Sequence, residues 1–185
     1  MTFKKTLAAT AALAITLAGG AAIAANPMVG GAAMYPDKNI IENAVNSKDH
    51  ETLVAAVKAA GLVETLQGEG PFTVFAPTDD AFAALPAGTV ETLLKPENKD
   101  KLTKILTCHV VAADAMSAAI TKMIDDDKGA HPVKTVGGCE FTAMYEGDTI
   151  MIKDGMGNVA NVTIADVDQS NGVIHVIDKV LLPAS

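Results

Sequence analysis

Apolar residues recur at intervals of three and four along the first half of the chain, a spacing that places side chains on one side of an α-helix. It predicts helices within residues 39–47 and 49–62, two more within 88–111, and another within 114–129. We expect Asp49 and Asp114 to cap the helices that follow them, and Gly61 and Gly129 to end those helices.

The stretch FTVFA, residues 72–76, predicts a strand that is buried on both sides. Phe72, Val74 and Phe75 place large apolar groups on both faces, which is typical of a strand covered from both directions. Pro77 is expected to end this strand because it has no backbone N–H to donate.

The polar turn after this strand predicts the start of a helix. Thr78 or Asp79 can accept hydrogen bonds from the free amides of the first helical turn. Asp79 and Asp80 also suit the positive end of the helix dipole, so the two acids need no catalytic explanation. The inner side of the helix is predicted to consist of Ala81, Phe82 and Leu85.

The second half of the chain changes to short apolar segments separated by turn-forming residues. Strands are predicted within residues 131–136, 139–147, 148–155, 158–169 and 172–183. Helices followed by strands, without an internal repeat, argue for a single α+β domain.

The first 25 residues are typical of a secretory signal peptide. Two lysines precede an apolar run over 7–17, and cleavage is expected near Ala24 and Ala25. The mature protein should therefore be periplasmic or secreted, and an uncleaved signal would be its one attachment to a membrane. Residues 26–38 show no helical or strand periodicity and are expected to form an N-terminal extension.

The charge of the chain excludes one class of partner. The full sequence has 14 lysines, no arginine and 22 acids, for a net charge of −8. Loss of the signal would remove two lysines and no acid, leaving a net charge of −10. An acidic chain with 4% aromatic residues lacks both the basic surface and the stacking side chains of nucleic-acid binders.

Two cysteines, Cys108 and Cys139, lie 31 residues apart in this apparently exported chain. An oxidising compartment and an even count favour a disulfide between them. Such a bridge would stabilise the domain by roughly 3.5–4 kcal/mol through loop closure. Two buried thiols that behave as small hydrophobic groups are the alternative.

FTVFAPTDDAF and SNGVIHVIDKVLLP together closely resemble the two signature motifs of fasciclin (FAS1) domains. Between them, TCHVV stands where the family has a tyrosine–histidine pair, with Cys108 in place of the tyrosine before His109. Interaction roles of that tyrosine therefore do not transfer. The resemblance covers residues 39–183 and implies a FAS1 fold, in which helices pack on a small β-wedge or sandwich with the signature strands close together.

The resemblance also identifies family motif positions with structural or interaction roles. They are Phe72, Phe75, Pro77, Thr78, Asp79, Phe82, His109, Asn171, Gly172, His175 and Asp178. Strand alternation places Val173, His175 and Ile177 on one face, so His175 is expected to be buried and hydrogen-bonded. The family implies no catalytic activity and no cofactor.

Two chemical alternatives remain to be weighed. Cys108 beside His109 suggests a thiol nucleophile with its base, but neighbours on an expected strand point to opposite faces, and a bridged cysteine has no thiol. We therefore expect no enzyme. Soft-metal binding by histidines, cysteines and methionines has no supporting M-x-x-M, H-x-H or C-x-x-C spacing, and stays a third hypothesis.

The leading hypothesis is a non-enzymatic module for cell-surface or extracellular interaction, whose partner would be a protein or glycan of the cell surface or matrix. The runner-up is a carrier of a small hydrophobic ligand, carotenoid-like or lipid-like. The apolar fraction of 49% leaves room for a hydrophobic groove.

Overall fold

The computed structural model describes residues 26–184, so the predicted signal peptide lies outside the described residues. The helices are α1 (Ile40–Ala44), α2 (Glu51–Ala60), α3 (Val63–Leu66), α4 (Asp79–Ala83), α5 (Thr89–Leu93), the 3-10 helix η1 (Pro96–Asn98), α6 (Lys99–Cys108) and α7 (Ser117–Asp126). The strands are β1 (Met28–Val29), β2 (Ala32–Ala33), β3 (Phe72–Pro77), β4 (Val110–Val111), β5 (His131–Lys134), β6 (Glu140–Glu146), β7 (Thr149–Lys153), β8 (Val159–Gln169) and β9 (Gly172–Ile177). The succession of helices and then strands confirms the α+β prediction.

Seven strands form one sheet in the order β4-β3-β9-β8-β7-β6-β5. The signature strands β3 and β9 are the second and third strands of this sheet and run parallel, with Phe72 opposite Gly172 and Pro77 opposite Ile177. Gly172 permits this pairing, because a Cβ at its φ of 151° would collide with the Phe72 backbone. The expected proximity of the two motifs is confirmed.

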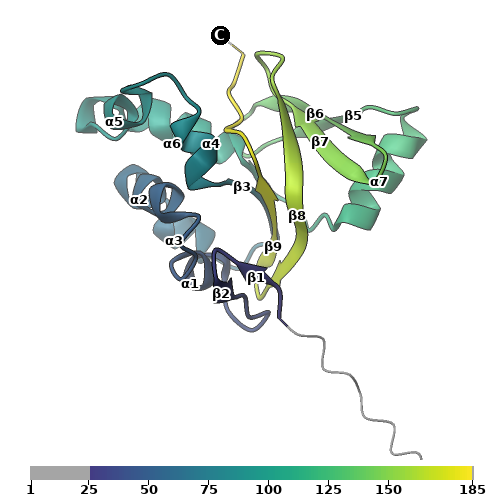
Figure 1. The fold of residues 1–185 in the computed structure, drawn as a ribbon, viewed down its shortest axis with the longest axis horizontal. Coiled ribbons are helices and arrows are strands. Elements are labelled where there is room, and N and C mark those ends of the chain that lie inside the picture. Colours follow the sequence, from purple (N-terminus) through teal and green to yellow (C-terminus); the bar gives the residue numbers. More distant parts are fainter. Residues whose placement is uncertain (1–25, 185) are drawn as a thin grey trace, which may run out of the picture.

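The sheet bends along β8, which pairs with β7 near its start and with β9 over the rest of its length. Register shifts between Val162 and Val167 interrupt the ladder, and Asp166 adopts a positive φ of 57° there. Such bulges bend and twist a strand. Helices α1 to α6 lie on one side of β3 and β9, whereas β5 to β7 and α7 lie on the other (Figure 1).

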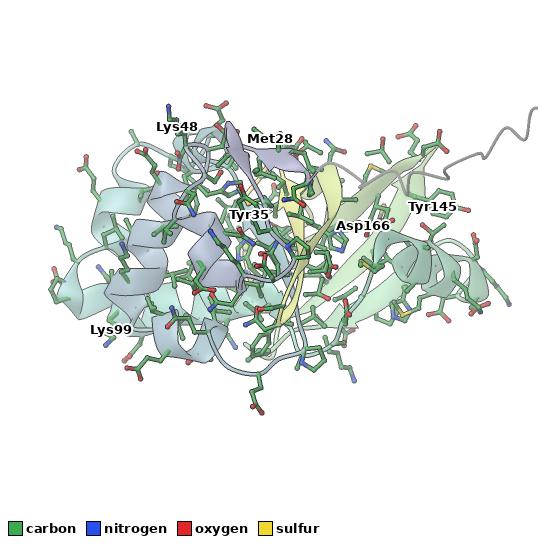
Figure 2. The ribbon with its side chains drawn as sticks, turned by 90° about the horizontal axis from the view of Figure 1, so that it is seen from below. Met28, Tyr35, Lys48, Lys99, Tyr145 and Asp166 are labelled. Atoms are coloured by element: carbon green, nitrogen blue, oxygen red, sulfur yellow. A yellow bond between two sulfur atoms is a disulfide. The ribbon has the colours of Figure 1, made fainter. Side chains whose placement is uncertain are left out.

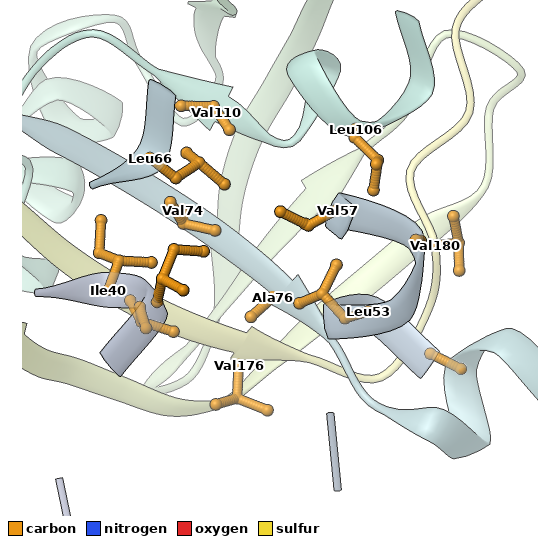
Figure 3. Close-up of a cluster of buried hydrophobic side chains, with 14 of the residues drawn as sticks. Ile40, Leu53, Val57, Leu66, Val74, Ala76, Leu106, Val110, Val176 and Val180 are labelled. Carbon is orange, nitrogen blue, oxygen red and sulfur yellow. The ribbon is translucent and has the colours of Figure 1, made fainter. Parts of the chain in front are cut away.

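Alternate residues of β3 and β9 contribute to two separate hydrophobic cores. Val74, Ala76, Ile174 and Val176 belong to the core beneath α1 to α6, shown in Figure 3. Phe75 and Ile177 instead belong to the core formed with α7 and β6 to β8. The prediction that both faces of the strand at residues 72–76 are covered is therefore confirmed.

The segment before α1 is not the irregular extension that its sequence suggested. Strands β1 and β2 form a small antiparallel hairpin, and Val29 and Met34 are buried in the helical core. Asn43 fixes this segment, since its amide donates to the Tyr35 carbonyl at 2.7 Å and its Oδ1 accepts from the Tyr35 N–H at 3.0 Å. Two-residue strands are too short to produce a periodic pattern, which explains why the hairpin was missed.

Two predicted helix caps are wrong because distant residues take their place. Helix α2 receives its cap from Asp79, whose carboxylate accepts from the Thr52 N–H at 2.8 Å and from the Glu51 N–H at 3.3 Å, and not from Asp49. Helix α7 begins at Ser117, whose N–H donates to Asp166 Oδ1 at 2.6 Å, and not at Asp114. Gly61 ends α2 in the left-handed conformation, as predicted.

Cys108 is the last residue of α6 and His109 is its C-cap, so the expectation that both lie on a strand is wrong. A disulfide joins Cys108 to Cys139, with the two Cα atoms 5.4 Å apart. The bridge links the end of α6 to the start of the β6 hairpin. No cysteine within residues 26–184 is free.

Candidate functional site

The first signature motif builds a corner between two helices. Phe75 is buried and stacks on the His175 ring, with the ring centroids 5.7 Å apart. Thr78 caps α4 through its hydroxyl, which accepts from the Ala81 N–H at 3.3 Å, while the neighbouring Asp79 caps α2. Phe82 is buried in the helical core. Each of these side chains is engaged inside the domain.

His109 connects α6 to the C-terminal segment. Its Nε2 accepts from the Leu181 N–H at 2.9 Å, which leaves the proton on Nδ1 to be donated to the Ile105 carbonyl at 2.9 Å. Burial lowers the pKa of His109 to about 4, a shift opposed by the Ile105 carbonyl and by the charge of Asp154. His109 is therefore a neutral structural link at neutral pH.

His175 has a similar role on β9. It is fully buried, its Nε2 donates to the Ala115 carbonyl at 2.8 Å, and its Nδ1 accepts from the Asp166 N–H at 3.3 Å. Burial is the main cause of the lowered pKa of His175, and the Ala115 carbonyl opposes it. The predicted buried and hydrogen-bonded His175 is confirmed.

The second signature motif ties the turn between β8 and β9 to the helices. Asn171 accepts from the Ile40 N–H at 3.0 Å, and its amide donates to the Leu66 and Gly68 carbonyls at 2.8 Å each. Asp178 accepts from both the backbone and the side-chain amide of Asn161 at 2.7 Å. The polar motif residues thus serve as connections within the fold.

The contacts among the described residues support neither of the two chemical alternatives, a thiol nucleophile or a soft-metal site. The Cys108 sulfur is bonded to Cys139 and is no nucleophile. His131 pairs with Asp127, with Nδ1 and Oδ2 2.6 Å apart. Within residues 26–184, no three side chains among His, Cys, Asp and Glu are grouped as a metal site would require.

A closed apolar pocket lies between the N-terminal hairpin, α1 to α3 and β3, and His50 lines it. His50 Nδ1 contacts the Ser47 hydroxyl at 2.8 Å, but its buried Nε2 has no hydrogen-bond partner within the described residues. Burial lowers the pKa of His50; the Ala76 carbonyl opposes this shift, although its geometry to Nε2 falls short of a hydrogen bond. The pocket volume of about 50 Å³ is too small for a carotenoid-like ligand.

A second hollow is much larger and open to solvent. This groove, of about 750 Å³, runs between the segment 85–93, one side of α6, the β7–β8 turn and the C-terminal segment. Its lining includes Leu85, Leu93, Ile105, Met156, Leu182 and Pro183, together with Lys101 and Lys104. The volume lies in the range of sites for small organic ligands. Leu182 and Pro183 belong to the end of the second signature motif, whereas no residue of the first motif lines the groove.

None of the helices in residues 26–184 has both the length and the apolar character needed to span a bilayer.

Comparison with known proteins identifies the family. The fasciclin domain model matches residues 48–183. The Synechocystis protein sll1483 is 55% identical over 146 residues, which cover 78% of this chain and 73% of that protein. The cell surface glycolipoprotein MPB83 of Mycobacterium bovis is 32% identical over 163 residues, covering 88% of this chain and 63% of the relative.

Among solved structures, a FAS1 domain pair from the insect cell adhesion molecule Fasciclin I has the same fold. The TM-score is 0.71 at 19% identity, with 80% of this chain and 51% of that chain covered. At this identity the match supports the fold alone. The relatives named here carry no enzyme names, in keeping with a family of non-enzymatic domains. The match over residues 48–183, the two signature strands and the shared fold agree: the chain belongs to the fasciclin (FAS1) domain family.

Proposed function

We propose that this protein is an exported, non-enzymatic FAS1 module that binds a protein or glycan at the cell surface or in the matrix. One observation carries the proposal: residues 48–183 form a FAS1 domain whose signature residues make internal contacts. A surface-exposed relative and an adhesion protein of the same fold support it. Recognition is then a property of the outer surface, not of the signature motifs.

Adhesion through one domain also requires some form of multivalency or tight binding, because single weak contacts release quickly. Beads coated densely with the mature protein should be retained by cells or matrix of the source organism. Soluble mature protein should compete for that retention. Beads coated with an unrelated acidic domain of similar net charge are the control.

Retention equal to that of the control beads would contradict the proposal. Release by soluble protein at low concentration would indicate tight binding by one domain. Release only by oligomeric protein would indicate avidity. Light scattering on the soluble protein separates these two cases, since it gives the oligomeric state directly.

The groove supports a second candidate function, the carriage of a small hydrophobic ligand. Its volume of about 750 Å³ and its mainly apolar walls are the specific observation in favour. Protein purified from its native host should then carry an extractable lipid-like molecule or a pigment, detected by mass spectrometry and by the absorption spectrum. A colourless, lipid-free preparation that binds nothing on reconstitution would remove this candidate.

A further inference from the structure

One wall of the groove is formed by one face of α5 and one face of α6. Thr89, Thr92 and Leu93 of α5 follow the i, i+3, i+4 spacing of a single helix face. On α6, Lys101 and Ile105 share a face in the same way, with Lys104 beside them. Both lysines therefore share a wall with Leu93 and Ile105, which are buried, and the Lys104 ammonium contacts the Gly137 carbonyl just outside the lining.

The opposite wall comes from the end of the chain. Leu182, Pro183 and Ala184 line it together with Met156 of the β7–β8 turn. Figure 1 shows the yellow C-terminal segment beside this turn, at the edge of the molecule where α4 to α6 also lie. The Leu182 N–H donates to the buried Asp154 carboxylate at 3.0 Å, which fixes the segment to the turn. Met156 is 58% exposed, so its flexible side chain stands at the mouth of the groove.

The charge of the lining is opposite in sign to that of the protein. Acids outnumber lysines by 22 to 14 in the whole chain, yet the lining contains two lysines and no Asp or Glu. Lys104 donates to the Gly137 carbonyl, a neutral partner that leaves its positive charge uncompensated. Neither of the ion pairs found in residues 26–184 involves Lys101 or Lys104.

We propose that the groove binds a single-chain amphiphile with an anionic head group, carboxylate or phosphate. The apolar chain would lie between Leu93, Ile105 and Leu182, and the head group would face Lys101 and Lys104. The inference rests on the second candidate function above and specifies its ligand class. An inorganic anion would leave the apolar walls exposed to water, and a neutral or cationic lipid would leave the lysines without a counter-charge.

Titrations with decanoate, decyl phosphate, decanol and decyltrimethylammonium compare head groups of different charge on alkyl chains of similar length. All four probes are used below their micelle-forming concentrations. Amide chemical shifts in ¹H–¹⁵N spectra report where each probe binds. Decanoate or decyl phosphate should shift residues of α5, α6 and the C-terminal segment. The two anionic probes also distinguish a fatty-acid head group from a phosphate one. Decanol should bind more weakly, and the cationic probe should not bind in the groove.

Substitutions then test the lysines against a matched control. Lys101→Gln and Lys104→Gln should each weaken decanoate binding by about threefold, and the double variant by about tenfold, as expected for exposed charge pairs. Lys99→Gln is the control, because Lys99 is exposed on the same helix but does not line the groove (Figure 2). It should leave the dissociation constant unchanged. Met156→Asp should weaken binding through the apolar chain.

The outcomes have distinct meanings. Equal affinities for decanol and decanoate, unaffected by the lysine variants, would overturn the anionic preference while leaving ligand carriage in place. Absence of groove shifts with every probe would overturn both the inference and the carrier function. Shifts spread evenly over the surface, equally reduced by Lys99→Gln, would overturn the groove as the site.

Discussion

Asp79 lies in the first turn of one helix and caps another, since its carboxylate accepts from two backbone amides of α2. An acid in this position stabilises the positive end of the α2 dipole and satisfies amides that have no partner within the helix. This capping role accounts for the acidic residue in the signature motif, so no catalytic role is needed to explain it.

Replacement of Asp79 by Ala should therefore destabilise the domain by about 1 kcal/mol, the usual cost of a lost cap. The free energy of unfolding in urea measures the effect. Asp80→Ala is the matched control: Asp80 is an exposed acid in the same turn. It should change stability by less than about 0.5 kcal/mol. Equal effects of the two substitutions would show that charge, and not the cap, is the cause.

The buried histidines make stability depend on pH. The folded pKa of His109, about 4, lies below its ordinary value of 6.5, and the pKa values of His50 and His175 are lowered too. The unfolded chain therefore binds protons more readily, so stability is complete above pH 6.5 and is lost as pH falls toward 4. Protonation would also turn the Nε2 acceptor of the Leu181 N–H into a donor.

We expect the free energy of unfolding to fall by about 2 kcal/mol from His109 alone between pH 7.5 and pH 5. Urea denaturation across this range measures the slope, and His109→Gln should flatten it. NMR titration of the His109 ring gives a second test that does not depend on a variant. A ring that titrates near pH 6.5 in the folded protein would contradict the structural role.

At the scale of elements, local patterns predicted most of the architecture. The corner from Phe72 to Phe82 and the strands of the second half follow from alternation, proline and turn residues, which act over a few residues. The caps supplied by Asp79 and Asp166 did not follow, because each bridges segments 27 to 49 residues apart. The pairing of Cys108 with Cys139 was favoured by compartment and by the even number of cysteines, and Cys108 lies at the end of a helix predicted within residues 88–111.

The disulfide joins Cys108, the last residue of α6, to Cys139, which lies directly before β6. Alkylation in denaturant without reductant should therefore label neither cysteine, and alkylation after reduction should label both, as mass spectrometry will show. Reduction should lower the free energy of unfolding by about 4 kcal/mol. A Cys108→Ser, Cys139→Ser double variant should not respond to reductant. Labelling before reduction would establish free thiols.

At the scale of the molecule, the groove could not be predicted, because its walls come from α5, α6, the β7–β8 turn and the chain's end. No local pattern in any of these segments marks a binding surface. The hairpin was missed for a related reason: Val29 and Met34 are buried because they pack on the helical core, which no local pattern shows. Tertiary contacts therefore determine both the groove and the packing of the hairpin.

The hairpin is part of the folded core and not a linker. Met34→Ala should cost about 2–5 kcal/mol, as expected for a side chain that is 2% exposed. Met28→Ala removes an exposed methionine of the same hairpin, 58% exposed, and should cost less than about 0.5 kcal/mol. Thermal or urea unfolding compares the two. Similar small effects from both would mean that the hairpin does not pack on the domain.

The parallel pairing of β3 with β9 has a consequence for how the protein is made. The ribosome synthesises β3 nearly a hundred residues before it synthesises β9, the strand that separates β3 from β8 in the sheet. Helices α1 to α6 thus emerge while β9, which supplies Ile174 and Val176 to the core beneath them, is still absent. Contacts between such distant segments form slowly and late. The domain can therefore close its core only after the residues of β9, up to Ile177, have been synthesised.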